Sequence, residues 1–175
     1  PTHVWVTVHP SLNVSDPDFE RKIAHEVTHG LLFYARGYSR LEVKPSSSLY
    51  GQRVAMVVNG MVDELVVNKL IQAEGYSPFG PNYLSDVKGH ISAARSRRNP
   101  YPDYGLGAMF RSKYMVLRYI LAWGFLQFYA IDPETRSLLT LFLNEFEAAY
   151  PHEYEMAIEV KKILNQQNIF ESGGQ

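Results

Sequence analysis

The pattern of apolar positions predicts a mainly helical chain with one short strand near its start. Residues 3–8 alternate Val4, Val6 and Val8 with other side chains, which is typical of a β-strand. After residue 15, apolar residues instead recur every three or four positions, as in helices that bury one face. We expect helices over about 16–36, 52–74, 85–95, 109–129, 132–149 and 151–163.

The first of these helices has start and stop signals at both ends. Ser15-Asp16-Pro17-Asp18 offers an N-cap, a proline in the first turn and acids at the positive end of the helix dipole. Arg36-Gly37 is a typical stop signal. Its apolar stripe, which we expect to be the packed face, comprises Phe19, Ile23, Val27, Leu31 and Tyr34. His25 and His29 lie off this stripe.

The same helix carries the strongest chemical signal in the chain, His25-Glu26-Val27-Thr28-His29. Residues four apart lie one above the other on a helix, so the two imidazoles can bind one small cation together. Zinc accepts neutral histidine nitrogens in a tetrahedral site with one position open to water. Glu26 is then placed to take a proton from that water. The motif therefore predicts zinc-assisted hydrolysis, most often of a peptide bond.

A third metal ligand is expected from the second predicted helix. Asp63 and Glu64 lie in a stretch that is otherwise strongly apolar and ends at Glu74-Gly75. Acids buried in such a stretch are costly unless they are paired or bind a metal. A bound zinc would explain them; the alternative is that one or both face solvent or a basic partner. Residue pattern alone does not choose between Asp63 and Glu64.

His25-Glu26-Val27-Thr28-His29 followed by a glutamate on a second helix resembles the gluzincin branch of zinc metallopeptidases. The family's third ligand lies in a pattern such as E-x-x-A-D or E-x-x-A-N, and Glu64-Leu65-Val66-Val67-Asn68 is similar, with Val67 where the family has a smaller residue. The resemblance favours Glu64 as the ligand. The spacing is similar to that of compact members related to the IrrE and ImmA regulators. It implies an α+β, mainly helical zincin-like domain with a small N-terminal strand or sheet.

Composition is that of one globular domain. We expect residues 1–175 to form a single domain, with a metal-site half over 1–75, a helical half over 76–170 and a short tail over 171–175.

The net charge of −1 indicates neither a nucleic-acid nor a membrane partner. The absence of cysteine excludes disulfides and thiolate metal sites, and fits a cytoplasmic location. No apolar run is long enough to span a bilayer. The oligomeric state stays undetermined.

Three residues are candidates to stabilise an oxyanion in the expected reaction. Tyr101 and Tyr104 follow an arginine-rich stretch, and His90 lies in the third predicted helix. Each also has a simpler explanation as a structural or exposed residue, and the sequence does not select among them.

The leading hypothesis is a zinc-dependent metallopeptidase that acts on a peptide or protein substrate. His25, His29 and Glu64 would bind the zinc and Glu26 would be the general base. The first alternative is a non-catalytic binding or regulatory module that keeps a zincin fold. The second is a helical protein in which the motif is accidental.

Overall fold

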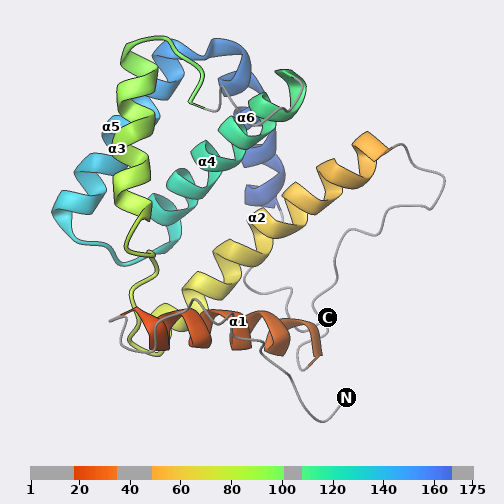
Figure 1. Cartoon of the computed structure of the whole chain (residues 1–175), viewed down its shortest axis with the longest axis vertical. Coiled ribbons are helices and arrows are strands. Elements are labelled where there is room, and N and C mark those ends of the chain that lie inside the picture. The colour runs from red at the N-terminus through yellow and green to blue at the C-terminus, as the bar shows by residue number, and fades with distance from the viewer. Residues whose placement is uncertain (1–17, 35–48, 101–107, 167–175) are drawn as a thin grey trace.

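The computed structural model describes residues 18–34, 49–100 and 108–166, and every regular element in these segments is an α-helix (Figure 1). The helices are α1 (Phe19–Tyr34), α2 (Leu49–Ala73), α3 (Tyr83–Arg95), α4 (Ala108–Phe128), α5 (Pro133–Ala149) and α6 (Pro151–Gln166).

The expected α+β fold is wrong, because the described segments contain no strand. The physical reason is visible in the pattern: from residue 18 on, apolar residues recur at helical spacing, so these segments offer no alternating edge to pair. The strand expected over residues 3–8 lies outside the described residues. Residues 52–59 belong to α2, in agreement with the helix expected over 52–74.

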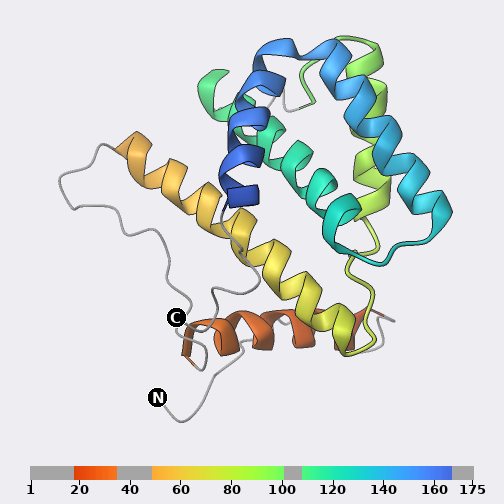
Figure 2. The ribbon, with the colours of Figure 1, turned by 180° about the vertical axis from the view of Figure 1, so that it is seen from behind.

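Helices α3 to α6 form one group, and α2 connects this group to α1 (Figure 1). Helix α3 packs on α5, and α4 packs on both α5 and α6. Figures 1 and 2 show α2 running obliquely from this group to α1, which lies across its carboxyl-terminal part. Helix α2 contacts α4 on one side and α1 on the other. Although α2 and α4 are long and largely apolar, none of the described helices could cross a membrane.

Helix α2 contributes to both hydrophobic clusters of the described structure. Met61 and Leu65 belong to the larger cluster with aromatic and aliphatic side chains of α3 to α6. Val67 and Ile71 belong to a smaller cluster with Leu32 of α1. A helix buried on two sides has little freedom to rotate, because any rotation would expose one of its apolar faces.

The close approach of α2 and α4 depends on Gly124. A Cβ atom at this position would lie 2.5 Å from Cδ2 of Leu65, whose side chain is completely buried. Beyond this crossing, the Tyr129 hydroxyl donates a hydrogen bond to the carbonyl of Leu65. The side chain of Gln72 donates to the carbonyl of Ala130 at 2.6 Å. These contacts fix α2 against the end of α4.

Two helix ends confirm what the sequence predicts. Gly75 has φ of 91°, a left-handed conformation that favours glycine, and its N–H donates to the carbonyl of Gln72 at 3.0 Å. Before α5, the Asp132 side chain accepts a hydrogen bond from the Thr135 N–H at 2.8 Å, as expected of an N-cap.

Helix α1 does not pack through the apolar stripe expected from the sequence. Leu31 is 47% exposed, whereas Leu32 is 1% exposed and packs on α2 together with Ala24. Three other members of the stripe are only half-buried: Phe19, Ile23 and Val27. The packed face of α1 is therefore the one that carries His25 and His29. Helical spacing alone did not distinguish two faces that both carry apolar residues.

The crossing of α2 and α4 leads to a test of stability. We expect Leu65→Ala to lower the free energy of unfolding by about 2–5 kcal/mol, because it leaves a cavity where α2 meets Gly124. Urea unfolding followed by circular dichroism measures the change. Leu141→Ala is the matched control: this leucine is 37% exposed, so its loss should cost less than about 0.5 kcal/mol. Equal losses for both variants would contradict the role of Leu65.

Candidate metal centre

The two histidines of α1 and a glutamate of α2 meet between these helices. His25 and His29 lie one turn apart, and their Nε2 atoms are 3.1 Å from each other. Oε1 of Glu64 lies 3.4 Å from Nε2 of His25 and 3.5 Å from Nε2 of His29. Residues more than thirty positions apart in the sequence thus bring three donor atoms to one point.

The spacing of these atoms fits one small metal ion. Ligands of a tetrahedral ion at metal–ligand distances of about 2.0–2.2 Å lie roughly 3.3–3.6 Å from each other. Two of the three separations fall in this range, and the histidine–histidine separation of 3.1 Å is slightly shorter. His25, His29 and Glu64 also form a group whose donor atoms all lie within 4.8 Å. These three residues could hold a metal ion.

Within the cluster, His25 and Glu64 each favour the charged form of the other. Burial acts to raise the pKa of Glu64, but hydrogen bonds from His25 and His29 outweigh it and lower this pKa to about 2. Burial likewise acts to lower the pKa of His25, but the hydrogen bond with Glu64 and the charges of Glu64 and Glu26 raise it overall. Glu64 is therefore a carboxylate at neutral pH, the form in which it can ligate a cation.

The hydrogen bonds around the cluster orient the carboxylate more than the imidazoles. Asn68, one turn after Glu64 on α2, donates from Nδ2 to Oε2 of Glu64 at 3.3 Å. The Nδ1 atoms of His25 and His29 are buried, and no described residue forms a hydrogen bond with either of them. Histidines that ligate metals usually donate this second N–H to an acceptor. The described part of the chain supplies the ligands without that support.

Glu64, rather than Asp63, is the acid that faces the histidines. Successive residues on a helix point about 100° apart, so only one of the two can face α1 at this level. Asp63 is 2% exposed and is not among the three residues of the cluster. The acid that the family resemblance favours, Glu64, is thus the one that lies beside the two histidines.

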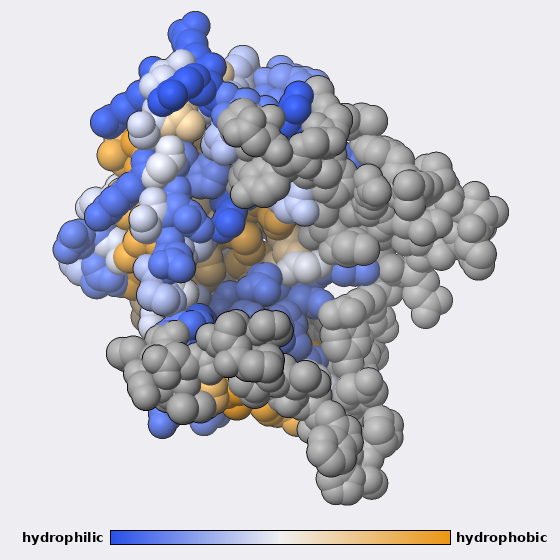
Figure 3. Space-filling model, in the orientation of Figure 1, coloured by the Kyte–Doolittle hydropathy of each residue, from blue (hydrophilic) through white to orange (hydrophobic). Residues whose placement is uncertain are grey.

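A cavity of about 470 Å³ opens beside the cluster and is lined by His25, Glu26 and Glu64. The side chain of Glu26 is exposed, so its carboxylate is accessible from this cavity. Opposite α1, the wall is formed by α4 and by the segment between α2 and α3. On the face seen in Figure 3, apolar surface lies at the centre and hydrophilic surface lies directly below it.

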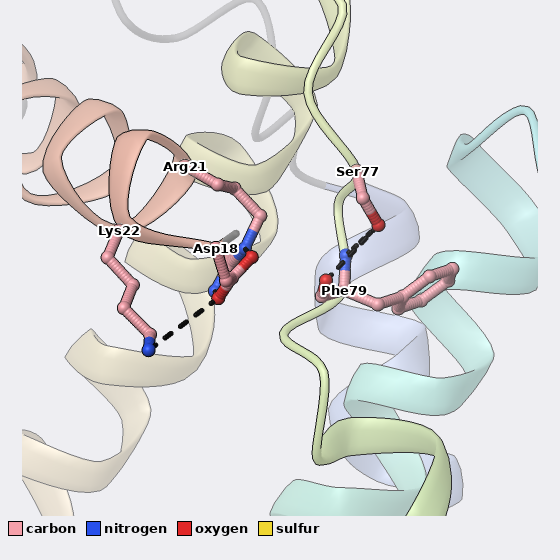
Figure 4. Close-up of polar contacts among 5 residues, drawn as sticks. All are labelled: Asp18, Arg21, Lys22, Ser77 and Phe79. Carbon is pink, nitrogen blue, oxygen red and sulfur yellow. Dashed lines mark hydrogen bonds and ion pairs between the residues drawn. The ribbon is translucent and has the colours of Figure 1, made fainter. Parts of the chain in front are cut away.

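Aromatic contacts fix the segment between α2 and α3 against the cavity. The Ser77 hydroxyl bonds to the backbone of Phe79, and the Phe79 side chain points away from α1, toward α4 (Figure 4). The Phe79 ring stacks on Tyr83 with centroids 5.3 Å apart and meets Phe125 edge-on at 4.7 Å. The cavity therefore combines a polar side that carries the motif with an aromatic side.

Of the three expected oxyanion donors, only His90 lies among the described residues, and it does not line this cavity. His90 is not among the lining residues, and its ring lies against Phe142 at 5.9 Å. Burial, and next the charge of Arg118, lower the pKa of His90 to about 4, so it is neutral at pH 7. Tyr101 and Tyr104 lie outside the described residues.

Among the described residues, the tyrosines that line the cavity are Tyr83 and Tyr114, and neither is a candidate from the sequence. Burial raises the pKa of Tyr83 well above its usual range, which keeps its hydroxyl protonated. No motif marks either residue, and only their placement on α3 and α4 brings them to the cavity.

Comparison of the chain with protein-family models, curated proteins and solved structures finds no match. The likeness to gluzincins therefore rests on the residues of the motif and on the position of Glu64.

The geometry leads to a test of the metal site. We expect Glu64→Gln to weaken zinc or cobalt binding at least about 100-fold, because a neutral amide is a far poorer ligand than a carboxylate. Asp63→Asn is the matched control and should leave metal affinity unchanged, whatever it does to stability. Isothermal titration calorimetry measures the affinity, and the rise of the melting temperature with added metal checks it. The reverse ranking would assign the ligand to Asp63.

Proposed function

We propose that this chain is a zinc-dependent metallopeptidase. The observation that supports this best is the approach of Glu64 to within 3.5 Å of both histidines of the H-E-x-x-H motif. An accidental motif would not account for a glutamate from another helix at that point. A cytoplasmic location, suggested by the lack of cysteine, belongs to the same proposal.

The residues have two separate roles in this proposal, zinc binding and proton transfer. His25, His29 and Glu64 would hold the zinc through two neutral imidazoles and one carboxylate. When bound, zinc acts as a Lewis acid that polarises a carbonyl and acidifies water. Glu26 is next to His25 but outside the ligand cluster, and its exposed carboxylate can accept a proton from water and later give it to the leaving amine.

The cavity beside the cluster is suited to part of a peptide. Its volume of about 470 Å³ lies within the range of small-ligand pockets, and its aromatic wall can take an apolar side chain. The polar wall on α1 carries Glu26 close to where a peptide bond would then lie. A peptide or protein substrate accounts for both walls.

A non-catalytic module is the second candidate, and one observation favours it. The described residues provide no acceptor for the buried Nδ1 atoms of His25 and His29, and working zinc sites usually have one. A module of this kind would bind metal or peptide through the same residues without using Glu26 as a base. The two proposals therefore differ in what Glu26 does.

We expect Glu26→Gln to keep the fold and zinc binding while lowering the rate of peptide hydrolysis at least about 100-fold, because the amide cannot accept a proton. The measurement is cleavage of a quenched fluorescent peptide library by the zinc-loaded chain, together with zinc titration of both proteins.

Glu20→Gln is the matched control for this experiment. Glu20 is exposed in the first turn of the same helix and does not line the cavity, so its loss should leave the rate unchanged. Equal rates for wild type and Glu26→Gln would refute the proposed mechanism. Zinc binding by a wild type that cleaves no member of the library would favour the non-catalytic module.

A further inference from the structure

One face of α4 forms the wall of the cavity opposite the metal cluster. Its side chains recur at helical spacing, and all but one are aromatic or aliphatic: Tyr114, Leu117, Arg118, Leu121 and Phe125. Arg118 is the single charged residue that α4 contributes to this wall. A charge placed within an apolar wall needs a reason, because its desolvation is costly.

The contacts of Arg118 leave most of its hydrogen-bonding capacity unused. Within the described residues its one ion pair is with Asp86, at 3.8 Å from Nη2, which is too long for a charge-assisted hydrogen bond. Asp86 is itself 51% exposed, so water competes for it. A guanidinium has five N–H donors in a fixed fork that matches a carboxylate.

Arg21, on the other wall of the cavity, is a useful contrast. Its Nε and Nη2 donate to the two carboxylate oxygens of Asp18 at 2.6 and 2.9 Å, a bidentate pair that occupies the fork (Figure 4). Lys22 lies 4.0 Å from the same carboxylate. Among the arginines that line the cavity, Arg118 is therefore the one without a close carboxylate partner in the described structure.

The charge of Arg118 also acts on its surroundings. It contributes to the lowered pKa of His90 and opposes the rise in the pKa of Tyr83 that burial causes. Arg118 thus places a positive charge in the cavity close to an aromatic surface of Phe79, Tyr83 and Phe125. An anionic group beside a large apolar side chain complements this combination.

We propose that Arg118 binds a carboxylate of the peptide substrate, while the apolar side chain next to that carboxylate lies against the wall formed by α4 and Phe79. This inference rests on the proposed function, because it names the substrate class of the same cavity. The carboxylate has two possible sources, the free carboxyl terminus of a peptide and the side chain of an aspartate or glutamate. Both offer the same chemistry to the guanidinium.

Binding of three synthetic peptides tests this without any need for hydrolysis. The probes are acetyl-Ala-Ala-Ala-Phe with a free carboxyl terminus, the same peptide as its amide, and acetyl-Ala-Phe-Asp-Ala amide. Their affinities are measured by calorimetry for the full chain carrying Glu26→Gln, with one equivalent of zinc. The first or the third peptide, or both, should bind more tightly than the neutral amide.

The decisive comparison adds Arg118→Gln to this chain. The affinity for the carboxylate peptides should fall roughly 10- to 100-fold, the loss of a charge-assisted hydrogen bond, and that for the neutral amide should not change. Arg136→Gln is the matched control: this exposed arginine of α5 contacts the carbonyl of Leu126 and does not line the cavity. If Arg118→Gln does not fold, Arg118→Lys, which keeps the charge but not the fork, should give a smaller, carboxylate-specific loss.

The outcomes separate this inference from the proposed function. Carboxylate-dependent binding that requires Arg118 supports the inference even if the wild type hydrolyses nothing. If Arg118→Gln lowers the affinity for only the peptide with a free carboxyl terminus, the site recognises carboxyl termini. If it lowers the affinity for the aspartate peptide, the site recognises acidic side chains. No binding by any peptide at millimolar concentration overturns the inference, as does an equal effect of Arg118→Gln on the neutral amide.

Discussion

The burial of α2 on two sides is the constraint on which the rest of the described structure depends. The Leu65 side chain packs so closely on Gly124 that a Cβ atom would not fit at position 124. Val67 and Ile71 pack against α1 on the other side of α2. Because these contacts lie within two turns of each other, α2 cannot rotate without exposing an apolar face. Its rotation in turn determines which of its two adjacent acids points toward the histidines.

The position of Glu64 illustrates how a polar group is tolerated beside such packing. Burial alone would favour its neutral form, yet hydrogen bonds from two imidazoles and from Asn68 compensate the charge. The same arrangement brings together three donor atoms that could all bind one cation. Such an arrangement would be pre-organised for a cation, since the packing of the helices alone brings the three side chains together.

The cavity shows a division of chemistry between its walls. Helix α1 supplies Glu26 and the histidines, whereas α4 and the segment around Phe79 supply an aromatic surface interrupted by Arg118. Arg21 and Arg118 have the same side chain but different environments: one is held by a bidentate carboxylate and the other by a distant, half-exposed one. Their unequal pairing, rather than their charge, distinguishes a structural arginine from one suited to a ligand.

Local signals in the sequence determined the helices and two of the three residues of the candidate metal site. Motif spacing placed His25 and His29 on one helix face, and the glycine after Glu74 ended α2 where expected, because both depend only on near neighbours in the chain. Tertiary structure decided that the histidine face of α1 is the packed one, and that Arg118 lines the cavity whereas His90 does not. These features depend on which helix faces meet, and several faces of this chain are apolar enough to pack, so periodicity alone could not choose between them.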